Sequence, residues 1–104
     1  MLKILGRDTS SNVMKVLWAC AELGLEFDRE DIGGKHGGNN TPDFKKMNPN
    51  GLVPVIIDNG FVNWESNSCV RYLAAKHDPG GLYPDDPQVR AVAERWMDWQ
   101  VTTV

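Results

Sequence analysis

The stretch that decides the fold is residues 52–64, which read LVPVIIDNGFVNW. A β-branched run over 52–57 is followed by Asp58-Asn59-Gly60, and an Asn-Gly pair between two apolar runs is a strong signal for a hairpin turn. The segment therefore predicts two antiparallel strands, the second over 61–64. Pro54 removes a hydrogen-bond donor, so it belongs at the first residue of a strand or on an edge. A cis Val53–Pro54 bond would suit a turn that enters this strand, although trans is the commoner form.

Upstream of the hairpin, the chain alternates between strand and helix patterns. Residues 2–5 form a short apolar strand, and residues 25–32 alternate apolar with charged side chains, as a half-buried strand does. Between them, residues 13–23 carry apolar side chains at helical spacing, and Gly24 stands where helices commonly end in the left-handed conformation. A strand–helix–strand unit pairs its strands in parallel, whereas a hairpin pairs them antiparallel. We therefore predict one mixed four-stranded sheet with the strands in the order 2-1-3-4.

Further segments complete this α/β pattern. Residues 33–41, GGKHGGNNT, hold four of the ten glycines and predict a loop. Thr41 followed by Pro42 is typical of a helix start, and this short helix must end before the turn signal of residues 48–51. A helix over 65–76 follows the hairpin. The last helix begins after Asp85-Asp86-Pro87, and its apolar stripe consists of Val89, Val92, Ala93, Trp96, Met97 and Val101.

Composition and charge exclude several classes of protein. The 104-residue chain is 41% hydrophobic and 24% charged, as globular domains are, and its net charge of −3 provides no basic field for nucleic acid or an anionic membrane. No apolar run approaches the roughly 20 residues of a membrane span, and the start does not resemble a signal peptide. Cys20 and Cys69 form no CxxC pair and lie on apolar stripes, so we expect inert core thiols in a reduced, cytoplasmic protein. The cysteines, His36 and His77 have no metal-ligand spacing.

Several short motifs together resemble the cytosolic glutathione S-transferases, and the resemblance covers essentially the whole chain. They are residues 10–16 (SSNVMKV), 48–56 (NPNGLVPVI), 64–66 (WES), 71–74 (RYLA) and 82–84 (LYP). The first motif is most similar to the theta-like and yeast-prion-like bacterial branches of the family. Each motif alone would be weak, but in combination they are specific.

The resemblance implies a particular domain organisation. Residues 1–80 would form a thioredoxin-like domain with a mixed four-stranded sheet, a cis Val53–Pro54 bond and a glutathione site. Residues 81–86 would be a linker, and residues 87–104 the start of the first helix of an all-helical second domain. On this basis we expect the chain to be an N-terminal fragment or a truncated relative.

The turn before the 13–23 helix is the expected place for the glutathione thiol. A thiol is nucleophilic as its thiolate, and a hydroxyl at a helix N-terminus can stabilise this anion through a hydrogen bond and the helix dipole. The resemblance assigns this contact to Ser10 and an assisting role to Asn12, with Ser11 as the alternative to Ser10. Any of these residues, or Thr9, can instead serve only as the helix N-cap.

The γ-glutamyl end of glutathione needs a different kind of partner. Ser66 and nearby amides at the start of the 65–76 helix can bind its carboxylate, because a helix N-terminus attracts anions. Glu65 can pair with its ammonium group. The resemblance assigns these contacts to the two residues, and the alternative is a plain capping arrangement.

The resemblance also indicates how the rest of glutathione would be held. Val53, next to Pro54, would bind the cysteinyl amide through its backbone, so no particular side chain is required. The glycyl carboxylate needs a cation, and Lys35 and His36 in the glycine loop are candidates. Several members of the family carry Lys or Gln just before the Val-Pro pair, whereas this chain has Leu52, which cannot make that contact.

The implied function is that of a glutathione transferase with a role in detoxification. It would bind glutathione as co-substrate, without a metal, and activate its thiol for conjugation to a small electrophile. A thiol-disulfide oxidoreductase is disfavoured because Ser10-Ser11-Asn12 replaces a CxxC pair, and a non-catalytic interaction module is disfavoured because it would not need Ser10, Glu65 and Ser66. We expect a homodimer, because the apolar stripe of the last helix lacks cover within the chain, and little transferase activity from the 104 residues alone.

Overall fold

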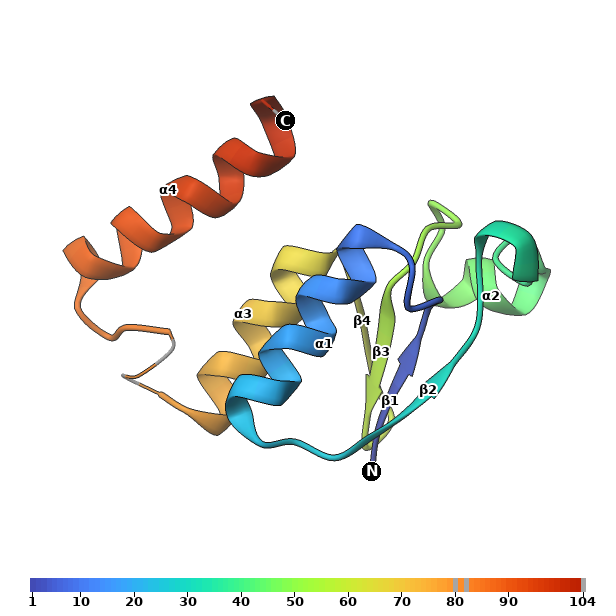
Figure 1. Ribbon diagram of the computed structural model, residues 1–104, viewed down its shortest axis with the longest axis horizontal. Helices are drawn as coiled ribbons and strands as arrows, with labels where there is room; N and C mark the ends of the chain where they lie inside the picture. Colours follow the sequence, from blue (N-terminus) through green and yellow to red (C-terminus); the bar gives the residue numbers. More distant parts are fainter. Residues whose placement is uncertain (80, 82, 104) are drawn as a thin grey trace.

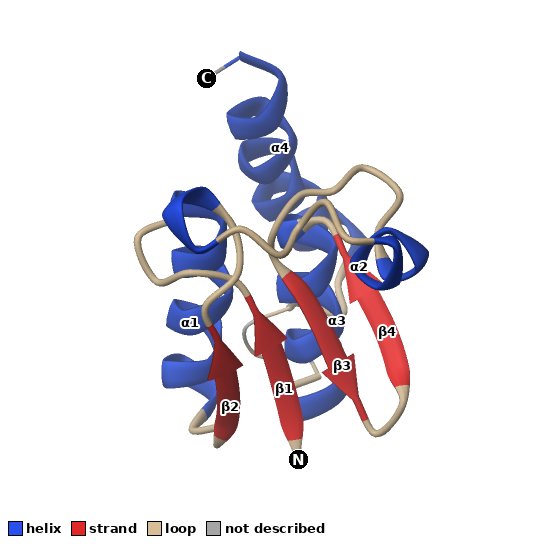
Figure 2. Ribbon diagram, turned by 90° about the vertical axis from the view of Figure 1, so that its right-hand side faces the viewer, coloured by secondary structure: helices blue, strands red, loops and turns tan. Residues whose placement is uncertain are grey.

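The chain folds as a four-stranded sheet with helices on both faces, in a computed structural model that describes residues 1–79, 81 and 83–103 (Figure 1 and Figure 2). In chain order the elements are β1 (Leu2–Leu5), α1 (Ser11–Leu23), β2 (Phe27–Glu30), a 3-10 turn η1 (Gly34–His36), α2 (Pro42–Met47), β3 (Val55–Asp58), β4 (Phe61–Trp64), α3 (Ser66–His77) and α4 (Pro87–Thr103). The alternation expected from the sequence is therefore present along the whole described chain.

The sheet has the predicted topology. Its strands lie in the order β2-β1-β3-β4, and β1 pairs in parallel with β2 but antiparallel with β3, which pairs antiparallel with β4. The β3–β4 turn consists of Asn59 and Gly60, with φ of 50° and 88°, as a tight hairpin requires. The Val53–Pro54 bond is cis, as the resemblance implied, and Pro54 precedes the first residue of β3. The mixed sheet and the cis bond are both confirmed.

Two observed strands are shorter than their apolar patterns. β3 begins at Val55 rather than at residue 52, and β2 covers Phe27–Glu30 rather than 25–32. The amide of Leu25 donates to the carbonyl of Cys20 at 2.9 Å, so this residue belongs to the end of α1 and not to the strand. Both corrections concern only the ends of strands.

The sheet separates two apolar layers, because successive side chains of a strand point to opposite faces. Figure 1 shows α1 and α3 side by side over one face, with α2 beyond the other. The larger core lies under α1 and α3 and contains Leu2, Ile4, Val16, Cys20, Ile56, Cys69 and Leu73. On the other face, Leu5 and Val55 pack with Phe44 of α2. The predicted apolar stripes of α1 and α3 therefore face the sheet.

Capping fixes the ends of the first two helices. The Ser10 hydroxyl accepts a hydrogen bond from the amide of Val13, and Gly24 takes the left-handed conformation with φ of 66°. Thr41 accepts from the amide of Phe44, and Pro42 occupies the first turn of α2. Since Ser10 is the N-cap, α1 begins at Ser11, two residues before the predicted start.

Helix α4 lies away from the sheet and contacts α1 and α3 through polar side chains (Figure 1). Arg71 of α3 forms ion pairs with Glu94 at 3.4 Å and Asp98 at 2.9 Å, and the Asn67 side-chain amide donates to the Met97 carbonyl at 3.0 Å. The linker expected over 81–86 includes Leu82, which lies outside the described residues, as does Gly80 before it. Large apolar side chains of α4 remain exposed, namely Val89, Val92, Trp96, Trp99 and Val101. No described helix combines the length and the apolar character that crossing a membrane requires.

Candidate functional site

A cavity of about 260 Å³ lies where the N-terminal ends of α1 and α3 meet the cis-proline loop. It is lined by Asn12, Asn48, Asn50, Leu52, Val53, Pro54, Trp64, Glu65 and Ser66. Five of the eight residues predicted for a glutathione site are therefore brought together, although they come from three separate parts of the chain. The remaining three, Ser10, Ser11 and His36, do not line this cavity.

Glu65 occupies an unusual position at the start of α3. Its φ is 75°, a region that residues other than glycine rarely adopt, and its carboxylate accepts a hydrogen bond from the amide of Asn67 at 2.9 Å. The carboxylate therefore caps the helix while its side chain stays exposed. Capping and ligand contact are compatible, because an ionised carboxylate has about four acceptor positions on two oxygens.

Ser66 lies at the centre of a polar network. It is only 5% exposed, and its hydroxyl donates to the Asn12 side-chain oxygen at 3.4 Å and accepts from the Lys15 ammonium, also at 3.4 Å. This pair of contacts directly links the predicted thiol end of the site, on α1, with the predicted γ-glutamyl end, on α3.

Ser10 and Ser11 have different surroundings. Ser10 is buried at 8% exposure, and its hydroxyl oxygen accepts from the Val13 amide at a long 3.5 Å, which leaves its proton available to another acceptor. Ser11 is exposed and lines a different, larger cleft. Of the two candidates for the thiol contact, Ser10 is thus the one held in place by the start of α1.

His36 lies in the short η1 turn of the glycine loop. Its imidazole is 4.0 Å from the Asp31 carboxylate, and the residue is exposed. The loop itself passes close to the cavity wall: a Cβ placed on Gly33 would stand 3.4 Å from a methyl group of Val53 and 2.7 Å from the Arg7 guanidinium. The glycine loop therefore borders the cavity, but His36 does not enter its lining.

Three asparagines, none of them predicted as site residues, hold the cis-proline loop. Asn48 is 2% exposed, donates to the Leu52 carbonyl at 2.9 Å and accepts from the Asn50 amide at 3.0 Å. Asn39 donates to the Gly51 carbonyl at 2.9 Å and so attaches the glycine loop to the same turn. These hydrogen bonds hold the backbone that leads into Val53. The sequence Asn-Pro-Asn-Gly predicted only that a turn was present there.

Neither cysteine has the character of a nucleophile. Cys20 and Cys69 are free and fully buried. Burial raises the pKa of both thiols, and for Cys69, where the nearby Glu65 charge adds to the effect, the pKa rises to about 12. The expectation of core thiols is confirmed. Among the residues that the structure describes, no three His, Cys, Asp or Glu side chains are placed to hold a metal ion.

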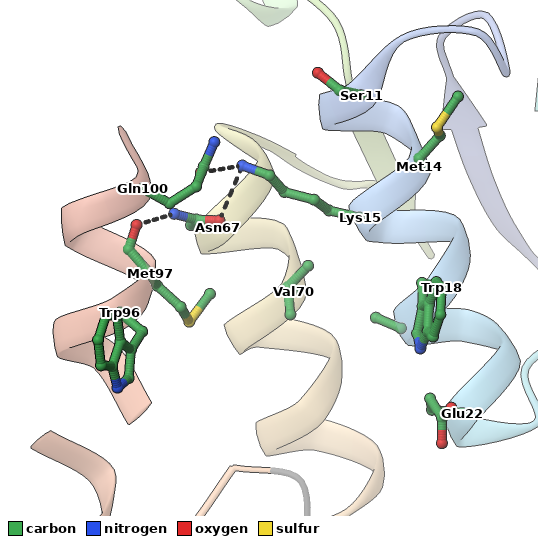
Figure 3. Close-up of a pocket in the computed structure, with 11 residues that line it drawn as sticks. Ser11, Met14, Lys15, Trp18, Glu22, Asn67, Val70, Trp96, Met97 and Gln100 are labelled. Atoms are coloured by element: carbon green, nitrogen blue, oxygen red, sulfur yellow. Dashed lines mark hydrogen bonds between the residues drawn. The ribbon is translucent and has the colours of Figure 1, made fainter. Parts of the chain in front are cut away.

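A second, larger cleft of about 710 Å³ opens between α1, α3 and α4 (Figure 3). Its apolar walls include Trp18 of α1, Val70 of α3 and Trp96 of α4, and Trp18 is 73% exposed. Figure 3 shows polar side chains from the three helices, Lys15, Asn67 and Gln100, that meet at one end of this cleft. This end is also the side on which Lys15 reaches Ser66.

Comparison with known proteins agrees with this geometry. Residues 9–76, more than half of the chain, match the family model described as glutathione S-transferase, N-terminal domain. The chain is 45% identical over 106 aligned positions to glutathione S-transferase GstB of Escherichia coli K12, an alignment that covers 100% of this chain and 51% of GstB. It is 37% identical over 84 residues to glutathione S-transferase D7 of Drosophila melanogaster, covering 79% of this chain and 38% of that protein.

Solved structures show the same fold. A theta class glutathione S-transferase from Xanthomonas axonopodis pv. citri, crystallised with glutathione bound, has a TM-score of 0.93 and 49% identity over 98% of this chain and 49% of its own. A diazinon-metabolizing glutathione S-transferase from Bombyx mori has a TM-score of 0.93 and 30% identity over 98% of this chain and 51% of its own. The chain spans about half the length of these relatives. The predicted thioredoxin-like fold is confirmed, and the chain belongs to the glutathione S-transferase family, with residues 9–76 as the N-terminal domain.

Proposed function

We propose that the cavity between α1, α3 and the cis-proline loop binds glutathione, and that the protein is a glutathione transferase. The observation that carries the proposal is the convergence of Asn12, Val53, Pro54, Glu65 and Ser66 on one cavity. A similar solved structure, from Xanthomonas, has glutathione bound, which supports the same ligand here.

The γ-glutamyl and cysteinyl parts of glutathione have suitable partners in this arrangement. The γ-glutamyl carboxylate would accept hydrogen bonds from the Ser66 hydroxyl and from amides at the N-terminus of α3, and Glu65 would pair with the ammonium group. The Val53 backbone would bind the cysteinyl amide. The sulfur then lies toward the N-terminus of α1, where Ser10 can donate a hydrogen bond and Asn12 can assist.

The chemistry of this site is activation of a nucleophile that the substrate itself carries. A hydrogen bond and the positive end of α1 stabilise the thiolate relative to the thiol, so the thiol loses its proton at a lower pH. The thiolate sulfur then attacks the electrophilic carbon of the second substrate and forms a carbon–sulfur bond, while the bond from that carbon to its leaving group breaks and the leaving group departs with the electron pair. The buried, protonated state of Cys20 and Cys69 speaks against the alternative, a thiol-disulfide oxidoreductase.

The organisation of the whole protein belongs to the same proposal. Residues 1–80 would be the glutathione-binding domain, 81–86 the linker and 87–104 the start of the first helix of a helical domain, in a cytoplasmic enzyme that acts in detoxification. The exposed apolar side chains of α4 support self-association as a homodimer.

Calorimetric titration with glutathione tests the proposed site. Glu65→Ala or Ser66→Ala should weaken binding by about ten- to a hundredfold, because a hydrogen bond to a charged group contributes about 1.5–3 kcal/mol. Glu26→Ala removes another exposed carboxylate, one that does not line the cavity, and it should bind as the parent does. No heat of binding from the parent would favour a non-catalytic interaction module, and unchanged binding by both site variants would place glutathione elsewhere.

A further inference from the structure

The Lys15 ammonium group lies at the point where α1, α3 and α4 meet (Figure 3). It donates to the Gln100 side-chain oxygen at 2.6 Å, to the Asn67 side-chain oxygen at 3.5 Å and to the Ser66 hydroxyl at 3.4 Å. Each of these acceptors is uncharged, and no ion pair formed by the described residues includes Lys15. A half-buried cation thus stands next to the cavity with its charge not neutralised by a carboxylate.

The contact with Lys15 determines what the Ser66 hydroxyl can do. A hydroxyl has one proton to donate and two lone pairs that accept. Lys15 occupies an acceptor position of Ser66, and the proton is directed toward Asn12, which lines the cavity. An anionic group in the cavity would be a stronger acceptor for this proton than the neutral amide oxygen of Asn12. Lys15 therefore prepares Ser66 to donate to an anion.

Gln100 holds Lys15 in this place. Its contact with the ammonium is the shortest of the three, and it comes from α4, close to the point where the Asn67 side chain donates to the Met97 carbonyl. Without this acceptor, the long Lys15 side chain would be free to turn into the open cleft beside it, whose lining it shares with Gln100. The polar end of the cleft is thus continuous with the wall of the smaller cavity.

We propose that Lys15 is a positioning residue for glutathione: it orients the Ser66 hydroxyl toward the γ-glutamyl carboxylate, and Gln100 of α4 holds it there. This inference rests on the proposed function and adds to it a residue that does not line the cavity. It also connects α4 to the affinity for glutathione, because the Lys15–Gln100 contact and the Ser66 contact share one ammonium group.

A double-mutant cycle between Lys15 and Ser66 tests the inference. By calorimetry, Lys15→Met should weaken glutathione binding about tenfold, and Lys15→Arg, which keeps the charge and the donors, should restore binding to within about threefold. In a Ser66→Ala background, Lys15→Met should change the affinity less than twofold. A tenfold loss in that background would show that Lys15 acts independently of Ser66 and would overturn the proposal, as would parent-like binding by Lys15→Met.

Further measurements separate this result from other causes. Lys3→Met removes one charge at the far end of β1, where Lys3 pairs with Glu30, and it should bind glutathione as the parent does.

Cysteinylglycine, which lacks the γ-glutamyl group, should bind to the parent and to Lys15→Met alike; a tenfold loss for this dipeptide contradicts the inference. Should Lys15→Met fail to fold, Lys15→Leu, which likewise has neither a charge nor a donor, takes its place with the same expected loss. If the parent does not bind glutathione, the proposed function is refuted. If the parent binds glutathione and Lys15→Met binds it with the same affinity, only this inference is refuted.

Discussion

At the N-terminal end of α1, three consecutive polar side chains have three different environments. Ser10 is buried and caps the helix, Ser11 is exposed beside the larger cleft, and Asn12 accepts a hydrogen bond from Ser66. All three are short polar residues in one turn, so the sequence alone left it open whether Ser10, Ser11 or Asn12 activates the thiol. Burial distinguishes the two serines. The capping hydrogen bond holds the Ser10 hydroxyl in one position, whereas the exposed Ser11 hydroxyl is solvated.

Ser10→Ala should raise the pKa of the thiol of bound glutathione toward the free value of about 8.5. The variant loses the proposed donor to the thiolate, and loss of the cap should also destabilise the fold by about 1 kcal/mol. Ultraviolet absorbance of the thiolate, followed against pH, measures the first effect, and urea denaturation measures the second. If Ser11→Ala moves the thiolate titration and Ser10→Ala does not, the role belongs to Ser11.

Asp58 should make the stability of the fold depend on pH. Its carboxylate is buried at the end of β3 and accepts hydrogen bonds from Lys76 and from the Tyr72 hydroxyl, both at 2.6 Å. These contacts, that of Lys76 first, hold the pKa of Asp58 below its ordinary value. The unfolded chain therefore binds the Asp58 proton more tightly than the folded one. The contribution of the ionised carboxylate to the free energy of unfolding is complete above the ordinary Asp pKa of about 4, and it is lost as the pH falls through the lower pKa of the folded state.

Asp58→Asn is the variant that tests this dependence. At pH 7 it should be less stable than the parent by about 1.5 kcal/mol, because it loses charged hydrogen bonds. Urea denaturation at pH values between 7 and 2 should show that this difference shrinks below about pH 4. A difference that stays constant over the whole range would mean that the Asp58 charge does not contribute.

At the scale of the elements, β1 and β4 have the bounds expected from the sequence, whereas β2 and β3 are shorter than their apolar patterns. Helix ends depend on local chemistry, and Ser10, Thr41 and Gly24 occupy the capping positions that their residue types favour. Strand ends depend on which neighbours are available to pair. Leu25 continues the apolar alternation of β2, yet its amide bonds to the end of α1, and no local pattern reveals that competition.

The left-handed end of α1 gives a test at this scale. Gly24 has φ of 66°, and a Cβ at this position would meet nothing within 4 Å, so any cost of a side chain comes from the backbone conformation alone. Gly24→Ala should therefore lower the free energy of unfolding by about 1 kcal/mol, whereas Gly24→Asn should cost less, because Asn tolerates this conformation. Urea denaturation of the parent and the two variants measures these differences. Equal stability of the parent and Gly24→Ala would contradict the requirement for glycine at this helix end.

At the scale of the whole molecule, the site divides into a predictable and an unpredictable part. Glu65 and Ser66 begin a helix directly after a strand, and this local arrangement already suggested an anion site. Lys15 and Gln100 are 85 positions apart, and their contact exists only because α1, α3 and α4 pack at one point. Tertiary placement of this kind leaves no periodic signal in a single sequence, which explains why both residues were missed.

The exposed apolar side chains of α4 predict self-association of the 104-residue chain. Trp96 is 61% exposed, and Trp18 faces the same cleft from α1 at 73% exposure. Burial of such side chains against a second copy contributes about 1.5–3 kcal/mol each. Sedimentation should show a dimer that Trp96→Glu dissociates and that Gln88→Glu, with the same added charge on α4, leaves intact. A parent that remains monomeric at high concentration would contradict the expected homodimer.

The central claim is that glutathione occupies the cavity between the starts of α1 and α3, and a heteronuclear NMR titration of the chain tests it most directly. On addition of glutathione, the backbone amide signals of Asn12, Val53 and Ser66 should shift together with one dissociation constant. Those of Trp18 and Trp96, which line the larger cleft, should move little. Saturable shifts centred on Trp18 and Trp96, or no shift at Val53 and Ser66, would contradict the account.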